Sequence, residues 1–143
     1  MMNALTLDMV TVFHDRAFAS VEADLKSDGF SVLQLDGSSA VDKSTFLAAV
    51  ERDLPVSPGL HAKNWDALID VLSDGLDRAD ADRVAVVWRR ADRLETADLQ
   101  VFVNAVLALT VVVRRIYDRA GSRERRALVI LLGDAPNYPM PPS

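Results

Sequence analysis

Three apolar runs constrain the fold of this chain more than any other feature. They lie at 30–35, 83–88 and 127–132, and the segments between them carry the apolar spacing of helices. Strands covered on both faces are apolar along their length, and parallel strands need a long connection that is usually helical. The order strand, helix, helix, strand, helix, strand predicts an α/β fold with a small three-stranded parallel sheet covered by helices.

Turn, capping and proline signals set the limits of the first of these helices. The pair Asp36-Gly37 is a strong turn signal after the first apolar run, and Asp42 or Ser44 is a suitable N-cap. Pro55 should end the helix, because the residue before a proline avoids helical backbone angles. The expected buried face consists of Phe46, Leu47, Val50 and Leu54.

Two further helices are expected. Asn64 is a good N-cap for a helix that runs to Gly75, a residue typical of helix ends. A longer helix is expected from Thr96 or Asp98 to about Arg119, although its run of three valines also suits a strand. The length of the segment and its polar ends favour the helix.

The chain divides into a main domain with an extension at each end. Residues 1–27 are predicted to form an N-terminal helical extension, since apolar residues between Ala17 and Leu25 recur at helical spacing. Residues 28–134 form the main domain. Residues 135–143 contain four prolines and are expected to form a tail without regular packing.

Composition and motifs exclude several classes of function. The net charge of −5 argues against a nucleic-acid partner, because nucleic-acid-binding proteins usually carry a basic face. The chain contains no cysteine, and therefore no thiolate metal site and no cysteine nucleophile. The two histidines lie far apart, and no phosphate-binding loop or hydrolase motif is present. We expect no enzyme activity, no catalytic residue, no metal and no cofactor.

The sequence also predicts where the chain acts. Its start lacks the basic region of a signal peptide and contains Asp8. The longest apolar stretch, 101–113, includes two polar residues and is too short to span a bilayer. We therefore expect a cytoplasmic monomer with no membrane partner.

An acidic stripe is the most informative local feature. Asp66, Asp70 and Asp74 recur at a four-residue step, which stacks them on one face of a helix. Like charges at this spacing destabilise a helix by roughly 0.2–0.5 kcal/mol per pair. Asp66 also complements the helix dipole, and Asp74 is compatible with a solvated helix end. The stripe as a whole favours a surface that meets a positively charged partner.

Charge is unevenly distributed along the chain. Residues 53–82 hold seven aspartates against one lysine and one arginine, whereas residues 114–126 hold six arginines against two acids. A dipolar protein attracts basic partners at its negative end, and some of these arginines are expected to pair with nearby acids. A second cluster, at the carboxyl ends of the predicted strands, suits a small ligand and comprises Asp36, Arg89, Arg90 and Asp134.

The sequence resembles the barstar family over about residues 30–132. The resemblance is carried by Asp36-Gly37 after the first strand, Leu54-Pro55 at the first helix end, the block Asn64-Trp65-Asp66-Ala67-Leu68, and Trp88-Arg89. Barstar proteins are small intracellular inhibitors that block the active site of a secreted ribonuclease. The resemblance implies their fold, a three-stranded parallel sheet packed with helices, and a basic ribonuclease or toxin domain as the partner.

The resemblance also implies which residues bind the partner. In the family, acids of the second long helix and the loop before it enter the nuclease cleft. Asp66 and Asp70 match the two acidic contact positions, Asn64 matches the family's asparagine, and Asp70 would replace a substrate phosphate. Asp74 continues the stripe. The preceding loop, which would set specificity, contributes Leu60, His61 and Lys63.

The sequence departs from the family at several contact positions. Its loop lacks the family's tyrosine, Ile69 replaces the tryptophan beside the main aspartate, and the acid of the later helix falls near Arg115 or Ile116. Two hypotheses remain open. The first is an immunity or antitoxin protein that inhibits a basic ribonuclease with its acidic helix. The second is a non-inhibitory interaction or regulatory module on the same fold.

Overall fold

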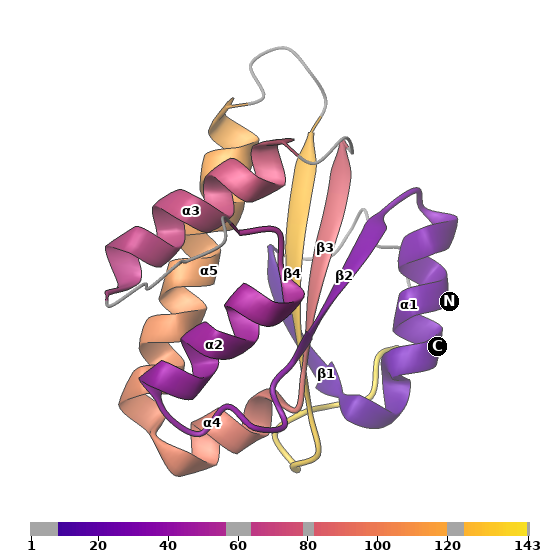
Figure 1. Ribbon diagram of the computed structural model, residues 1–143. Helices are drawn as coiled ribbons and strands as arrows, with labels where there is room; N and C mark the ends of the chain where they lie inside the picture. The colour runs from indigo at the N-terminus through magenta and orange to yellow at the C-terminus, as the bar shows by residue number, and fades with distance from the viewer. Residues whose placement is uncertain (1–8, 57–63, 79–81, 120–124, 143) are drawn as a thin grey trace.

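Four parallel strands form the sheet at the centre of the protein (Figure 1). The computed structural model describes residues 9–56, 64–78, 82–119 and 125–142. The strands are β1 (Val10–His14), β2 (Ser31–Asp36), β3 (Arg83–Arg89) and β4 (Arg126–Gly133). Their order is β1-β4-β3-β2. The three predicted apolar runs form β2, β3 and β4, and their parallel arrangement is confirmed.

Strand β1 corrects the predicted strand count from three to four. It pairs with the outer edge of β4, with Val12 opposite Leu131. The sequence predicted only a helix in this N-terminal segment. A strand of five residues carries little sequence signal of its own. It forms because β4 offers an edge of unpaired backbone groups that a further strand can satisfy.

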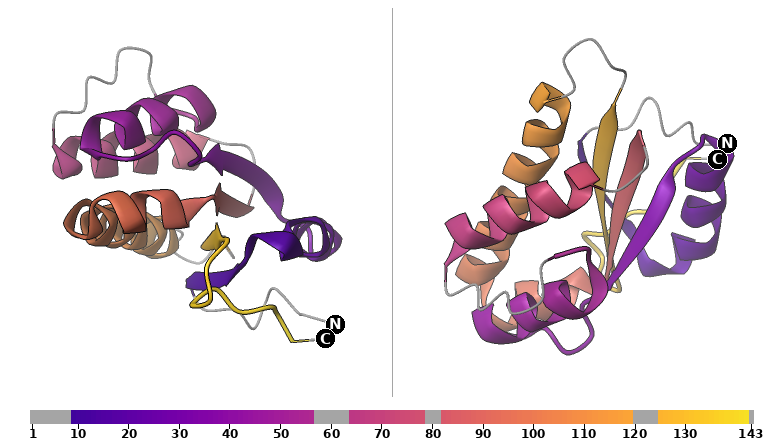
Figure 2. Two further views of the ribbon diagram at one scale, coloured as in Figure 1. Left: turned by 90° about the horizontal axis from the view of Figure 1, so that it is seen from below. Right: turned by 45° about the horizontal axis from the view of Figure 1, so that its top comes forward.

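Helices cover the two faces of the sheet unequally (Figure 2). In the described part of the chain, one face packs against α1 (Phe18–Ser27), which confirms the predicted N-terminal helix and follows a short 3₁₀ helix, η2 (Asp15–Ala17). The other face carries the remaining helices, namely α2 (Lys43–Asp53), α3 (Trp65–Arg78), α4 (Ala91–Ala97) and α5 (Leu99–Arg119).

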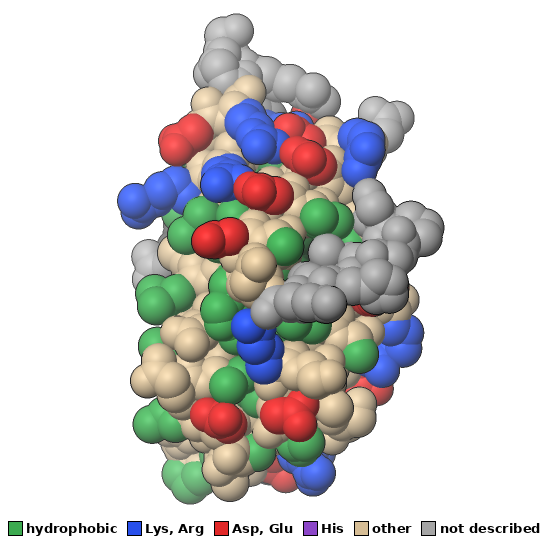
Figure 3. Space-filling view, turned by 60° about the vertical axis from the view of Figure 1, so that its left-hand side comes forward, with side chains coloured by type: hydrophobic (Ala, Val, Ile, Leu, Met, Phe, Trp, Pro, Cys, Tyr) green, Lys and Arg blue, Asp and Glu red, His purple; other side chains and the backbone are tan. Residues whose placement is uncertain are grey.

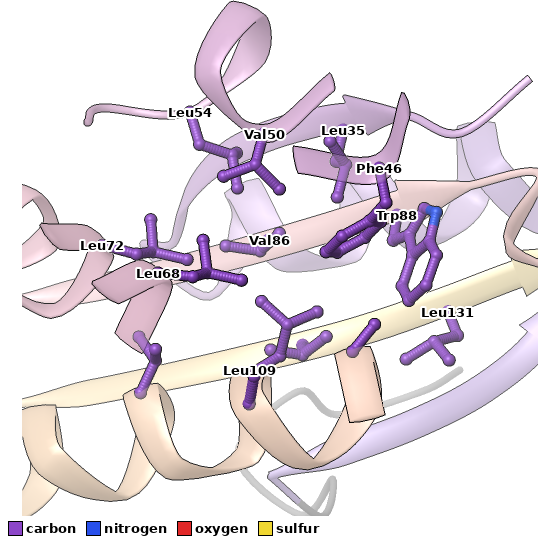
Figure 4. Close-up of a cluster of buried hydrophobic side chains, with 14 of the residues drawn as sticks. Leu35, Phe46, Val50, Leu54, Leu68, Leu72, Val86, Trp88, Leu109 and Leu131 are labelled. Atoms are coloured by element: carbon purple, nitrogen blue, oxygen red, sulfur yellow. The ribbon is translucent and has the colours of Figure 1, made fainter. Parts of the chain in front are cut away.

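Each face of the sheet has its own hydrophobic core. In β3, Val86 and Trp88 face the larger core beneath α2 to α5, whereas Ala85 and Val87 face α1. Both faces of β3 are therefore covered, which explains its apolar sequence. In the larger core, Phe46 of α2 packs against Trp88 with ring centroids 4.9 Å apart (Figure 4).

Capping residues place the helix starts close to the predicted positions. The side chain of Asp42 accepts a hydrogen bond from the backbone N–H of Thr45 at 2.8 Å. In return, Oγ1 of Thr45 accepts a hydrogen bond from the backbone N–H of Asp42. Asp98 accepts from the N–H of Val101 at 3.2 Å and begins α5. The run of three valines lies inside α5, as predicted, and the short helix α4 was not predicted.

Gly75 lies within α3 and does not end it, contrary to the prediction. The helix continues to Arg78. A Cβ atom at Gly75 would lie 1.5 Å from the backbone oxygen of Pro55, in the segment that follows α2. This glycine is therefore required by the close approach of α3 to a neighbouring segment, rather than by a helix stop.

The C-terminal tail packs against the domain without regular secondary structure. Between residues 134 and 142 the chain forms neither helix nor strand. Tyr138 is nevertheless buried, and its hydroxyl donates a hydrogen bond to Glu95 Oε1 at 2.9 Å. The backbone N–H of His14 donates to the carbonyl of Pro139 at 2.7 Å. The tail thus ties β1 to the helical side of the domain.

Helix α5 is long and apolar enough to span a membrane, judged by length and composition only. It packs in the larger core through six buried residues: Ala105, Ala108, Leu109, Val112, Val113 and Ile116. A core helix of a globular domain satisfies the same criterion, so the finding is weak support for a membrane span.

Candidate functional site

Helix α3 presents the predicted acidic stripe on its outer side. Its buried residues, including Leu68 and Leu72, face the sheet, so that Asp66, Asp70 and Asp74 face outwards. The side chains of Asp70 and Asp74 are 66% and 60% exposed. The acids are therefore accessible to a partner.

Asn64 begins α3, as the sequence predicted. Its Oδ1 atom accepts a hydrogen bond from the backbone N–H of Ala67 at 2.8 Å, which is the geometry of an N-cap. Asn64 is itself exposed. It therefore fixes the start of the helix on which Asp66 lies in the first turn, and it borders the same surface.

A row of arginines on α5 faces the acidic stripe. Arg115 Nη1 lies 2.6 Å from Asp70 Oδ1. One turn further along α5, Arg119 Nη1 lies 3.3 Å from Asp74 Oδ1 and 3.0 Å from Asp77 Oδ2. The hydrogen bond from Arg119 to Asp77 raises the pKa of this guanidinium above its usual value. The acids of α3 thus have partners within the chain.

Arg125 extends this row towards the interior at the end of α3. Its side chain is only 8% exposed and forms an ion pair with Asp77. Its Nη2 atom donates to the backbone oxygens of Leu76 at 2.7 Å and of Asp77 at 3.1 Å. These carbonyls belong to the last turn of α3, where a cation is favourable. Arg125 is therefore a structural residue of the helix end.

The uneven charge of the chain predicts arginine–acid pairs but does not specify which residues form them. Asp70 and Asp74 are four residues apart, and so are Arg115 and Arg119, so that two helices that run in the same direction can match them in register. This common spacing is the signal that would have found the pairs. Exposed ion pairs of this kind contribute only about 0–1 kcal/mol, so a binding partner can displace the arginines.

Asp66 differs from the other acids of the stripe. It is exposed, and no cation in the described part of the chain pairs with it. It follows Trp65, whose indole is partly buried and lies 6.0 Å from the ring of Phe46. Lys43 lies over the same indole, with its Nζ atom 5.5 Å from the ring centroid. Asp66 is therefore the acid whose charge is most available.

A shallow groove with a volume of about 180 Å³ lies between α3 and α5. It is lined by Trp65, Ile69, Asn104, Leu107, Ala108 and Val111. On this face, charged side chains of both signs gather over one end, and hydrophobic side chains lie beside and below them (Figure 3). Helical periodicity alone does not predict this groove, because the groove depends on which residues of α5 lie against α3.

The predicted loop residues Leu60, His61 and Lys63 lie outside the described residues. The role of their loop in specificity therefore stays a prediction. In the second predicted cluster, Asp36 lies opposite Arg89 in the sheet, but the charged side chains pair with residues outside the cluster. Arg89 pairs with Asp15 at 3.0 Å, and Asp134 lies 3.1 Å from Nε2 of His14. Both partners come from the N-terminal segment, so these residues tie that segment to the sheet.

Comparison with known proteins identifies the family of this chain. The family model described as Barstar (barnase inhibitor) matches residues 30–132, well over half of the chain. No curated protein matches the chain. The match spans β2 to β4 and includes α3 with its acidic stripe. The chain therefore belongs to the Barstar family.

Proposed function

We propose that this protein is an inhibitor of a basic ribonuclease or toxin domain, and that it blocks the active site of its target with the outer face of α3. It would act as a cytoplasmic monomer and as a binding protein rather than an enzyme. The observation that carries this proposal is the Barstar family match combined with three exposed acids in a row on α3, at Asp66, Asp70 and Asp74.

The chemistry of this face supports a basic partner. A ribonuclease binds RNA phosphates with basic side chains, and exposed carboxylates at helical spacing can occupy the same positions. Asp66 has no cationic partner in the described part of the chain and can pair with a cation of the partner directly. On binding, Asp70 and Asp74 would release an arginine of α5 and pair with a cation of the partner instead. Charge-assisted hydrogen bonds that become desolvated in an interface are stronger than the exposed pairs they replace.

The arginine row favours a second function, a non-inhibitory interaction module. Arg115 and Arg119 neutralise part of the stripe within the free protein. An inhibitor that relies on a strongly negative surface gains less from acids that are already paired. A regulatory module with a mixed-charge surface would suit a partner that carries both signs of charge.

An inhibition assay separates the two functions. The chain is titrated into barnase and into a panel of other basic ribonucleases that cleave a fluorogenic RNA. We expect stoichiometric inhibition of at least one enzyme, and we expect the double variant Asp66→Asn/Asp70→Asn to lose it while remaining folded. Glu51→Gln, an exposed acid on α2, is the matched control and should inhibit normally. If the folded chain inhibits no member of the panel, the non-inhibitory module becomes the preferred function.

A further inference from the structure

Helix α5 carries an exposed apolar stripe beside the arginine row. Leu99, Val103, Leu107 and Val111 recur at a four-residue step and are 61%, 41%, 58% and 40% exposed. Single exposed apolar residues are normal on a soluble protein. Four in one row form a continuous apolar strip, which is typical of an interaction surface.

Two residues of the stripe lie against α3 in a groove. Leu107 and Val111 line the groove of about 180 Å³ together with Trp65 and Ile69 of α3, and the buried Ala108 lies between them. Asn104 is the single polar residue among the described lining residues. Ligand pockets for drug-sized molecules measure about 300–1,000 Å³, so this groove has room for one large side chain rather than for a metabolite.

Asp66 places an exposed negative charge beside the groove, while Lys43 lies over the indole of Trp65 with its Nζ atom 5.5 Å from the ring centroid. Asp66 precedes Ile69 by three residues, so it neighbours this lining residue on the surface of α3. No cation in the described part of the chain pairs with Asp66. One turn further on, Asp70 already pairs with Arg115. A partner that brings a new cation therefore gains most at the end of the stripe that adjoins the groove.

We propose that this groove is the apolar anchor site for the protein partner. The partner inserts one aromatic or branched aliphatic side chain between Ile69 and Leu107, and an adjacent lysine or arginine of the partner pairs with Asp66. This proposal rests on the proposed function, since it names the chemistry of the partner at the same face. The combination of an apolar anchor with a neighbouring charge that becomes desolvated is common at the centres of protein interfaces.

The first experiment uses two small probes and requires no identified partner. Tryptamine and indole-3-propionate share the indole ring but differ in the sign of their charge. Each is titrated into the ¹⁵N-labelled chain, and amide chemical shifts are followed. We expect tryptamine to shift the amides of Ile69, Leu107 and Val111 with a Kd of about 1 mM. Indole-3-propionate should bind several-fold more weakly, because it faces Asp66.

Variants assign this binding to the groove. Leu107→Ala should weaken tryptamine binding several-fold. Leu99→Ala is the matched control, because it removes an equally exposed leucine of the same stripe outside the groove, and it should leave binding unchanged. Asp66→Asn should abolish the preference for tryptamine over indole-3-propionate. Shifts that are absent, or that centre on another surface, would overturn the proposal.

The second experiment uses any ribonuclease that the chain inhibits. Leu107→Ala should weaken inhibition about tenfold or more, as expected for a central apolar contact, whereas Leu99→Ala should not. If both variants inhibit like the unmodified chain, the groove proposal is wrong while the inhibitor function stands. If no ribonuclease is inhibited, the inhibitor function fails while the probe titration still decides the groove.

Sedimentation of the unmodified chain addresses the other possible occupant, a second copy of the same protein. We expect a monomer, with the groove accessible to the probes. A dimer that Leu107→Glu converts to a monomer, while Leu99→Glu does not, would show that the groove is a self-interface and would overturn the proposal.

Discussion

Arg115 determines how the charge of Asp70 is used in this protein. In the sequence, Asp70 looks like the central acid of a repulsive stripe. In the structure its carboxylate lies 2.6 Å from the guanidinium of Arg115, a residue 45 positions away. The resemblance to the family implies an acid near Arg115 or Ile116, and this chain has none at either position. The pairing of Arg115 with Asp70 turns part of an acidic surface into a mixed-charge surface.

The first prediction concerns this pair. Arg115→Gln should make Asp70 available and increase the affinity for a basic ribonuclease by up to about fivefold, since an exposed ion pair is worth about 0–1 kcal/mol. The association rate should rise and become more sensitive to salt. Stopped-flow binding at two salt concentrations measures both effects. Weaker binding of Arg115→Gln would instead indicate that Arg115 contacts an acid of the partner.

Asp53 links the end of α2 to the end of β2. Its Oδ2 atom accepts a hydrogen bond from the backbone N–H of Asp36 at 2.8 Å, and Arg52 donates to both of its carboxylate oxygens. The hydrogen bond from Arg52 is the main cause that lowers the pKa of Asp53 below its usual value of 3.8. Because the pKa is lower in the folded protein, ionisation of Asp53 stabilises the fold at pH values above 3.8. This stabilisation is lost as the pH falls through the lowered pKa.

The second prediction follows from the hydrogen bonds and pKa of Asp53. Asp53→Asn should lower the free energy of unfolding at pH 7 by about 1–3 kcal/mol, the range for hydrogen bonds to a charged group. The difference from the unmodified chain should shrink towards zero as the pH falls below 3.8 and through the lowered pKa of Asp53, where the carboxylate becomes protonated. Urea unfolding across this pH range measures the effect. A difference that is independent of pH would show that the charge of Asp53 is not the cause.

At the scale of whole elements, the position of α3 depends on a close approach to the segment after α2. Gly75 faces the backbone oxygen of Pro55, and no side chain fits between them. On another side of the helix, Asp66, Asp70 and Asp74 are exposed, whereas Ile69 is partly buried against the core. The glycine therefore allows α3 to pack closely while its acidic side stays accessible.

The third prediction tests this packing. Gly75→Ala would place a Cβ atom 1.5 Å from the oxygen of Pro55, which forces one of the two segments to move. We expect a loss of about 1–3 kcal/mol or more, even though alanine favours a helix by about 1 kcal/mol over glycine. Asp74→Ala, an exposed neighbour, is the control and should change stability by about 0.5 kcal/mol or less. Equal stability of the two variants, measured by urea unfolding, would contradict this account.

At the scale of the whole molecule, the two faces of the sheet have different structural roles. The face beneath α2 to α5 supports the candidate binding surface. The other face is covered by α1, with Val21 and Leu25 buried in a smaller core. Strand β1 protects the edge of β4 and is tied down by the tail at Pro139. The N-terminal segment therefore completes the sheet at a distance from the acidic stripe.

The fourth prediction concerns the N-terminal segment. Deletion of residues 1–27 should lower the thermal stability strongly, because it exposes the smaller core and the edge of β4. The fraction that folds should still bind the partner through α3. If the deletion variant does not fold, Leu25→Ala serves instead, with an expected loss of about 2–5 kcal/mol and unchanged binding. A deletion variant as stable as the full chain would show that the segment is a passive extension.

The sequence by itself determined the elements whose signals are local. Three strands, the cap at Asn64 and the outward row of acids follow from periodicity and from short-range hydrogen bonds, which neighbouring residues specify. For two other helix starts the sequence offered two candidates each, and the structure selects Asp42 and Asp98. The family resemblance followed from the same segments. Tertiary structure alone decided the fourth strand, the role of Gly75, the arginine partners of the acids and the apolar groove. Helical periodicity specifies which side chains share a face, but only packing determines which other element that face meets.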